Sequence, residues 1–208
     1  MPERPSSGAE GERFAVPLFP LPNVFLFPGC ILPLHVFEPR YREMIQDLLD
    51  GPGRLVMGTV LEEATHDLAG APPVHPTAGL GEIGRHEKLP DGRFLIWLIG
   101  LARVRINEIA STRLYRMVEA NILHEVTGNP AGGERLGPRL REAIRERCNG
   151  KIKLRPDLPV GRLADLLLQQ LKLPQSVMND LYSELSVCAR AKAALQEHCR
   201  RSQQPPSN

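Results

Sequence analysis

The sequence predicts an α+β protein in which a β-rich first part is followed by a helical second part. Glycine, proline and β-branched runs are frequent over residues 14–125, whereas helical periodicity dominates residues 134–201. The joining segment EVTGNPAGGER is rich in glycine and proline, as linkers are. The expected organisation is a disordered tail at 1–12, a β-rich domain at 13–126, a linker at 127–133, a helical bundle at 134–201 and a disordered tail at 202–208.

The most apolar stretch, FPLPNVFLFPGCILPLHVFEP at 19–39, contains five prolines. A membrane-spanning helix needs about 20 consecutive apolar residues, and prolines at this density argue against one. Proline cannot donate to a sheet ladder, so it is confined to edge strands, strand starts and bulges. We therefore expect short edge strands on either side of a turn at Phe27-Pro28-Gly29.

A helix is expected at 39–50. Its apolar residues recur at the i, i+3, i+4 spacing of a buried helical face. Pro39 suits the first helical position, where its missing N–H costs nothing, and Gly51 suits the position just past the end. The residues of the predicted buried face are Tyr41, Met44, Ile45, Leu48 and Leu49.

Strands are expected at 54–60, in a hairpin over 79–106 and at 115–123. The hairpin contains the turn sequence LPDGR between two apolar arms. Both faces of its second arm are apolar, which is typical of a strand in a closed or covered sheet and favours a core position for Trp97. Gly100 is expected to mark a bulge or bend. Several strands with one helix indicate a small barrel or sandwich.

Four amphipathic segments indicate the helical bundle, with Ser186 as the expected N-cap of the last. Their predicted inward residues are Leu136, Leu140, Ile144 and Cys148; Val160, Leu163, Leu167 and Leu171; Val177, Leu181 and Leu185; and Val187, Ala191, Leu195 and Cys199. Cysteine on such a face acts as a small hydrophobe, and no C-x-x-C is present, so we expect reduced, buried thiols. Without a recognisable signal sequence, a cytoplasmic location is expected.

The usual catalytic signatures are missing from the sequence. It contains no G-x-x-x-x-G-K-[ST], no G-x-S-x-G and no H-E-x-x-H, and its six histidines are scattered. We therefore expect a protein that is not an enzyme, with no catalytic residue, metal ligand or cofactor. The alternative is a hydrolase whose serine nucleophile and base come together only in the folded protein, which sequence motifs do not reveal.

The strongest charge feature is the segment 135–155, which has eight basic side chains against two glutamates and a net charge of +6. Such a segment is either the solvated face of a helix with its trailing loop or a surface for nucleic-acid phosphates. The first alternative is favoured because no aromatic residue lies between the basic ones to stack on bases.

Phe25 and Phe27 lie between Pro22 and Pro28, where a strand cannot keep a regular ladder. They either pack in the core or are exposed on a loop, and exposed aromatic residues mark partner surfaces.

The apolar stretch and its continuation resemble the Lon protease N-terminal domain family, also called the Lon substrate-binding domain. The resemblance covers about residues 13–200. The matching motifs are Phe19-Pro20-Leu21, Val24, Phe27-Pro28-Gly29, Pro33-Leu34 and Phe37-Glu38-Pro39-Arg40-Tyr41, followed by the hairpin sequence with Gly100 and Arg103 and by YRMVEANIL.

This resemblance implies a PUA-like β-barrel followed by a helical bundle, working in protein recognition. Full Lon proteases add an ATPase and a protease domain, and this sequence has no P-loop, so a stand-alone member is expected. The implied partner is a polypeptide client or a protease, with RNA as the alternative; no membrane partner is expected. The candidate partner-binding residues are Phe25, Phe27, Arg40, Tyr41, Arg103 and Arg105.

Overall fold

The computed structural model describes residues 13–64, 70–128 and 130–203, apart from the side chains of 130–134. The chain divides into two compact units, Met1–Leu123 and His124–Asn208, here called the β unit and the helical unit. The division falls three residues before the predicted end of the β-rich domain. The predicted tails, apart from Ser202 and Gln203, lie outside the described residues.

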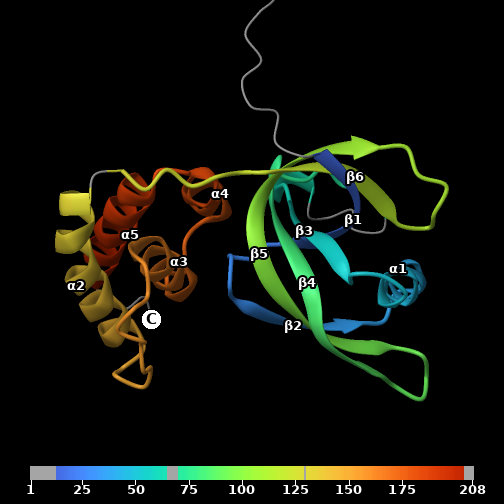
Figure 1. The fold of residues 1–208 in the computed structure, drawn as a ribbon, viewed down its shortest axis with the longest axis horizontal. Helices are drawn as coiled ribbons and strands as arrows, with labels where there is room; N and C mark the ends of the chain where they lie inside the picture. The colour runs from blue at the N-terminus through green and yellow to red at the C-terminus, as the bar shows by residue number, and fades with distance from the viewer. Residues whose placement is uncertain (1–12, 65–69, 129, 204–208) are drawn as a thin grey trace, which may run out of the picture. The chain divides into compact units, whose positions relative to one another are not determined.

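The β unit contains one mixed sheet (Figure 1). Its strand order is β2-β5-β4-β3-β1-β6, and β5 also pairs with β6, so the pairings β5–β4–β3–β1–β6–β5 form a closed circuit. The β1–β3 pair is parallel and the other pairs are antiparallel. The strands are β1 (Arg13–Pro22), β2 (Ile31–Val36), β3 (Arg54–Val60), β4 (Thr77–Lys88), β5 (Phe94–Ile109) and β6 (Arg116–Ile122).

Three of the five prolines in the apolar stretch lie in strands, Pro20 and Pro22 in β1 and Pro33 in β2, whereas Pro28 lies in a turn and Pro39 begins α1. β2 is an edge strand, as predicted. The prediction of a short edge strand is wrong for β1, which has ten residues and partners on both sides. These partners are staggered: residues 13–18 pair with β6 and residues 18–22 pair with β3. Pro20 and Pro22 lie beyond the last residue of β1 that pairs with β6. On that side their backbone has no strand to bond with, so the absence of a proline N–H destabilises the sheet little.

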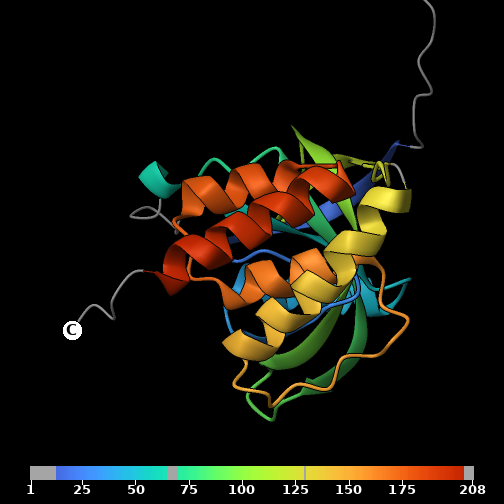
Figure 2. The same ribbon diagram turned by 90° about the vertical axis from the view of Figure 1, so that its left-hand side faces the viewer.

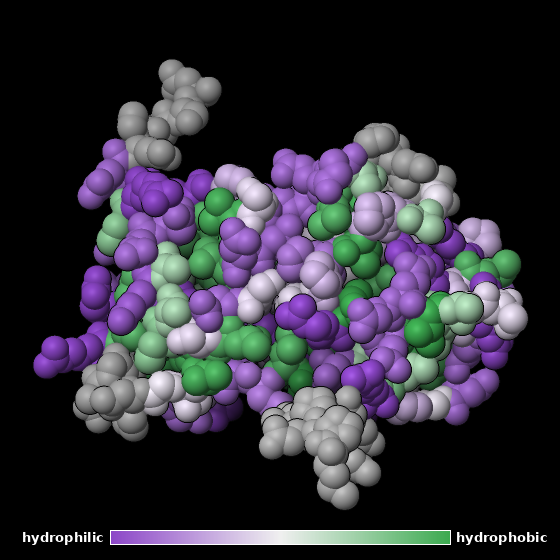
Figure 3. Space-filling view, turned by 90° about the horizontal axis from the view of Figure 1, so that it is seen from above, coloured by the Kyte–Doolittle hydropathy of each residue, from purple (hydrophilic) through white to green (hydrophobic). Residues whose placement is uncertain are grey.

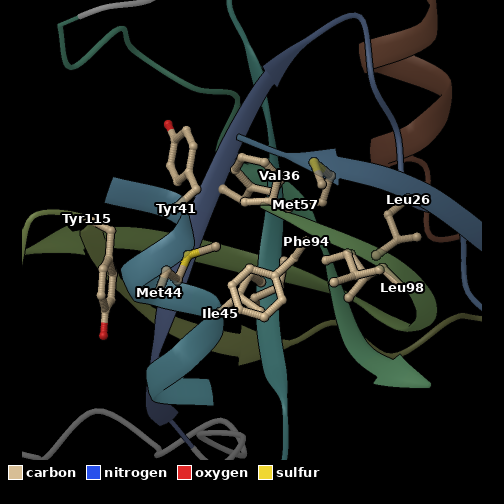
Figure 4. Packing of buried hydrophobic residues seen from close by; sticks show 12 residues of the cluster. Leu26, Val36, Tyr41, Met44, Ile45, Met57, Phe94, Leu98 and Tyr115 are labelled. Atoms are coloured by element: carbon tan, nitrogen blue, oxygen red, sulfur yellow. The ribbon is translucent and has the colours of Figure 1, made fainter. Parts of the chain in front are cut away.

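The helix α1 (Pro39–Leu49) covers the largest apolar cluster of the β unit and ends within one residue of the predicted position. Tyr41, Met44 and Ile45 are buried, and Figure 4 shows Met44 and Ile45 beside Phe94 of β5. Pro39 occupies the start of the helix, as predicted. A single turn of 3-10 helix, η1 (Glu62–Ala64), follows β3.

The predicted bend at Gly100 is a β-bulge. In the β4–β5 register Leu80 lies opposite Ala102 but Gly81 lies opposite Gly100, so Leu101 is the extra residue. The segment before β2 is fixed to this bulge, because Gly29 N donates to Gly100 O (2.6 Å) and Gly100 N donates to the carbonyl of Cys30 (2.9 Å).

The helical unit contains α2 (Pro130–Arg147), α3 (Val160–Gln170), α4 (Gln175–Ser183) and α5 (Val187–Ser202). α2, α3 and α5 pack against one another in pairs, and α4 packs against α5 (Figure 2). The predicted linker at 127–133 is wrong in its second half, since α2 begins at Pro130. Ser186 caps α5 as predicted, with its hydroxyl accepting from Ala189 N at 3.3 Å.

The inward faces of α2, α3 and α5 agree with the prediction in most positions, but Cys199 is exposed and Cys148 is half-buried. On α4 the predicted face is offset by one residue: Met178 and Tyr182 are buried, whereas the predicted positions Val177, Leu181 and Leu185 are half-buried. All four cysteines are free thiols.

Tyr115 connects the chain just before β6 to α1. Its hydroxyl donates to Asp47 Oδ2 (2.8 Å), and Arg113 Nη1 lies 3.1 Å from the same oxygen. Burial, reinforced by the hydrogen bond to the Asp47 carboxylate, raises the pKa of Tyr115 to about 12. In the unfolded chain a tyrosine titrates near pH 10.

The Tyr115→Phe variant is expected to lose about 1 kcal/mol of stability at neutral pH and to change the alkaline pH dependence. Above about pH 10 the unfolded state loses the tyrosine proton while the folded state keeps it, so this contribution is full below that pH and is lost up to about pH 12. Urea unfolding of both proteins near pH 8 and pH 11 measures the difference. The wild type should lose more stability than the variant over this interval; equal losses would contradict the assignment.

Candidate functional site

The outward face of the β2–β5 pair carries a cluster of apolar side chains. Ile31, Pro33 and His35 of β2 lie opposite Ile99, Trp97 and Leu95 of β5. The alternate residues, including Val36, Ile96 and Leu98, point into the core and are buried. Ile31 is 62% exposed and Phe37, just after β2, is 59% exposed. Contiguous apolar residues at such exposure are typical of partner surfaces.

This outward face is hollowed at its centre. A shallow pocket of about 220 Å³ is lined by Pro33, Leu34, His35, Leu95, Ile96 and Trp97. The guanidinium of Arg85 lies 4.7 Å from the centre of the Trp97 ring, and the ring of Phe37 lies 5.9 Å from that of His35. The pocket therefore offers aromatic and aliphatic walls to an apolar side chain.

The sequence reasoning missed this surface because both faces of β5 are apolar. Trp97 was expected in the core and is half-buried, and Ile99 is 37% exposed. The sequence pattern that could have predicted this surface is in β2 and the residue after it. There Ile31, Pro33, His35 and Phe37 alternate with the residues of the inward face.

Other large apolar side chains at the surface are separate from this cluster. Leu114, in the β5–β6 connection, is 67% exposed, and Val126 in the helical unit is 60% exposed. On the face seen in Figure 3, hydrophobic side chains reach the surface in several places between hydrophilic ones. Single exposed apolar residues of this kind are ordinary in proteins and need no partner.

Three of the six predicted partner-binding residues are buried and do not form an open contact surface. Phe27, Tyr41 and Arg103 are 2%, 4% and 2% exposed. The reason for Phe27 is the docking of its segment on Gly100, which folds the aromatic residue inward; its ring centre lies 5.5 Å from the Arg103 guanidinium. The Tyr41 ring packs 4.3 Å from that of Phe19, and burial raises the pKa of Tyr41.

Phe25 and Arg40 are half-buried and Arg105 is exposed, and none of the three lies in the segments 31–36 and 94–99 where β2 and β5 pair. Arg40 Nη2 lies 2.9 Å from Glu38 Oε2, and its guanidinium lies 4.6 Å from the Tyr41 ring. Arg105 lies on β5 opposite Asn121 of β6. Their role in partner binding stays a prediction.

Several cations of the basic segment 135–155 hold the helical unit together. Arg141 donates to the carbonyls of Arg155 (2.9 Å) and Pro156 (2.7 Å). Arg147 donates to His198 Nδ1 (3.0 Å) and, through Nη2, to Ser202 Oγ (3.1 Å). Two more cations are paired: Arg145 with Glu142 and Arg155 with Asp157. These contacts agree with the interpretation of the segment as a solvated helix face with its trailing loop.

Among the described residues, the hydrogen-bond partners of the His75 and His198 rings do not include a serine, threonine or cysteine side chain that either ring could activate as a nucleophile. His75 Nδ1 accepts from Thr77 N (3.1 Å), while His198 accepts from Arg147 and, through Nε2, meets Glu146 Oε2 at 3.0 Å. Within the described ranges, no three His, Cys, Asp or Glu side chains are grouped as a metal site would require. No helix in the same ranges has the length and apolar character to cross a membrane.

Comparison with known protein families gives one model that matches most of the chain. The model of the ATP-dependent protease La (LON) substrate-binding domain matches residues 15–197. Lon protease 2 of Sorangium cellulosum is 29% identical over 199 residues, which cover 87% of this chain and 24% of that protein. Lon protease of Escherichia coli is 26% identical over 155 residues, covering 74% of this chain and 19% of that protein. The chain therefore spans a quarter or less of the length of these relatives.

Two solved structures share the fold. The Lon N-terminal domain protein from Xanthomonas campestris has a TM-score of 0.65 at 18% identity, and the alignment covers 92% of this chain and 99% of that one. The N-terminal domain of the Mycobacterium avium complex Lon protease has a TM-score of 0.68 at 15% identity, covering 89% and 98%. At these identities the likeness concerns the fold alone.

Proposed function

Because the chain belongs to the ATP-dependent protease La (LON) substrate-binding domain family, we propose that it binds polypeptide segments on the outward face of β2 and β5. It acts as a non-catalytic substrate-recognition or adaptor module in protein quality control. The observation that carries this proposal is the exposure of Ile31 and Phe37 beside the apolar pocket at Trp97. An unfolded segment supplies the large apolar side chains that such a face can bury.

The energetics favour apolar segments. Burial of one phenylalanine side chain contributes about 1.5–3 kcal/mol. When a client covers Phe37 and places an apolar side chain in the pocket, burial of the client's side chain and burial of Phe37 both contribute to the binding free energy. A folded protein keeps its apolar side chains in its own core and has none to place there. The surface thus distinguishes unfolded from folded polypeptides by exposure of apolar residues.

We further propose that the closed circuit of strand pairings is the PUA-like barrel that the resemblance implies. Captured segments are passed to an ATP-dependent protease, and the protein works in the cytoplasm. Protease activity belongs to the much longer Lon protease relatives, and the matched family model concerns the substrate-binding domain of an ATP-dependent protease.

The Phe37→Ser variant is expected to bind unfolded polypeptide about ten- to a hundredfold more weakly than the wild type, because a bound segment no longer buries the ring. The measurement is fluorescence anisotropy with a reduced, alkylated globular protein that carries a fluorescein label. Phe37 is 59% exposed, so the variant should keep the stability of the wild type.

The matched control is Leu114→Ser, which removes a 67% exposed apolar side chain from the β5–β6 connection. It should bind the labelled polypeptide as the wild type does. Equal weakening by both substitutions, or by neither, would count against a binding surface on β2 and β5.

RNA binding has less support than polypeptide binding. Arg141 and Arg147 are occupied within the helical unit, and Arg145 and Arg155 have carboxylate partners. Affinity for RNA rests on cations that neutralise phosphates and therefore falls steeply with salt. Filter binding of a single-stranded RNA at low and moderate salt would reveal such an activity.

A further inference from the structure

We infer that the bound polypeptide is an additional β-strand on the free edge of β2, and that its backbone is recognised together with its side chains. This inference rests on the proposed function and specifies how the same surface holds its client. In the described part of the chain, β2 has β5 as its only strand partner. The opposite edge of β2 is therefore available for backbone hydrogen bonds.

The register of the β2–β5 pair determines which backbone groups face this edge. Gly100 N donates to the carbonyl of Cys30, and Ile31 lies opposite Ile99. In an antiparallel pair, residues that bond to the partner strand alternate with residues whose N–H and C=O groups point away from it. The bonded positions are thus the even-numbered residues of β2, and the backbone groups of Ile31, Pro33 and His35 point to the free edge.

Pro33 occupies one of these edge-facing positions, where its missing N–H removes nothing from the bonds with β5. The edge consequently offers three carbonyl acceptors, at Ile31, Pro33 and His35, but N–H donors only at Ile31 and His35. It is a usable hydrogen-bonding template with one gap at its centre. The gap removes one hydrogen bond to an added strand and leaves N–H donors on both sides of it.

The edge and the apolar face suit a single occupant. The side chains of Ile31, Pro33 and His35 lie on the outward face, so every second residue of an added strand points to that same face. Those residues would lie beside Phe37 and the pocket at Trp97. The surface is therefore suited to extended segments with apolar residues at alternate positions and without proline at the pairing positions.

Two substitutions in β2 are expected to change the affinity for the peptide in opposite directions, and a third serves as a control. His35→Pro removes an edge-facing N–H without removing a bond to β5, and it is compared with His35→Ala, which keeps the N–H. We expect His35→Pro to bind about tenfold more weakly than His35→Ala. Pro33→Ala adds a donor at the gap and should bind about two- to tenfold more tightly than the wild type.

The probe is a short fluorescein-labelled peptide in which phenylalanine and valine alternate with serine. Two further versions carry backbone N-methyl groups on one or the other alternate set of residues. In a strand paired along one edge only, one set of N–H groups faces β2 and the other faces solvent. One methylated version should therefore lose at least tenfold in affinity while the other binds like the parent peptide. Circular dichroism of each protein variant verifies that it is folded.

The outcomes separate the inference from the proposed function. If the two methylated peptides bind equally, or if His35→Pro and His35→Ala bind equally, the added strand is excluded, while a loss of binding in Phe37→Ser would leave the apolar-face proposal standing. If the wild type binds neither the parent peptide nor the unfolded protein, the proposed function fails, and the inference fails with it.

Discussion

Replacement of Arg190 by alanine is expected to lower the free energy of unfolding of the helical unit by about 3–5 kcal/mol. The Arg190 side chain is fully buried at the start of α5, and Asp165 of α3 is 1% exposed. Arg190 Nε lies 2.9 Å from Asp165 Oδ1. Removal of the cation leaves the Asp165 carboxylate buried next to an empty space.

The same guanidinium fixes two further segments of the helical unit. It pairs with Glu125, in the segment that precedes α2, and its Nη1 donates to the carbonyl of Glu184 at 2.6 Å. That preceding segment is also bonded to the turn between α4 and α5, since Val126 N donates to Leu185 O and Val187 N donates to Val126 O, both at 2.9 Å. Loss of Arg190 therefore loosens α3, the α4–α5 turn and the entry to α2 together.

Urea unfolding followed by circular dichroism at the helix band measures the effect. The control is Arg200→Ala, which removes a 69% exposed arginine from an i, i+3 pair with Glu197 on the same helix; its cost should stay within about 0.5 kcal/mol. If Arg190→Ala and Arg200→Ala unfold at the same urea concentration, the buried cluster does not stabilise the unit as described.

Replacement of Gly100 by alanine is expected to destabilise the β unit by about 3 kcal/mol. A Cβ atom at Gly100 would lie 2.2 Å from the Phe27 carbonyl oxygen and 2.9 Å from its carbon. These are backbone atoms of a segment that is held to Gly100 by the Gly29 N–H donor and the Cys30 carbonyl acceptor, so they cannot move aside without breaking the docking of that segment. Relief of the overlap would expose Leu26 and Phe27, which are 1% and 2% exposed.

Gly84→Ala is the matched control, because Gly84 is the extra residue at the other irregular point of the β4–β5 register. A Cβ there meets the tip of the Ile99 side chain, a flexible group that is 37% exposed. The cost should be below about 1 kcal/mol. The single tryptophan, Trp97 of β5, reports unfolding of the β unit by its fluorescence. If Gly100→Ala and Gly84→Ala have the same unfolding midpoint, the overlap of a Cβ atom at Gly100 with the Phe27 backbone does not destabilise the β unit as expected.

Elements determined by local chemistry could be predicted from the sequence. α1 has its proline at the start, its apolar stripe and its glycine beyond the end, and the structure places it within one residue of the prediction. The LPDGR turn joins β4 to β5, Gly100 is at a bulge, and Ser186 caps α5. In each case a residue and its immediate neighbours suffice, because the requirement is one of backbone conformation or of a nearby hydrogen bond.

Predictions that depend on distant partners succeeded less often. Phe27 and Phe25 have similar neighbours in the sequence, yet Phe27 is buried because its segment docks on Gly100, some 70 residues later in the chain. β1 was expected as a short edge strand, and the staggered partners β3 and β6 that make it longer come from two other parts of the chain. The candidate surface was missed for the same reason, since alternation in β5 alone does not say which apolar face is covered.

By itself the sequence determined the family, the order of a β-rich part and a helical part, the positions of α1 and of the β4–β5 hairpin, and the absence of the usual catalytic motifs from these residues. Only the tertiary structure decided which aromatic residues are accessible, that Trp97 lines a pocket on β2 and β5, and that Arg190 and Asp165 form a buried pair. The physical reason is that periodicity and turn chemistry act between near neighbours, whereas burial depends on which distant segment pairs with which strand edge or face.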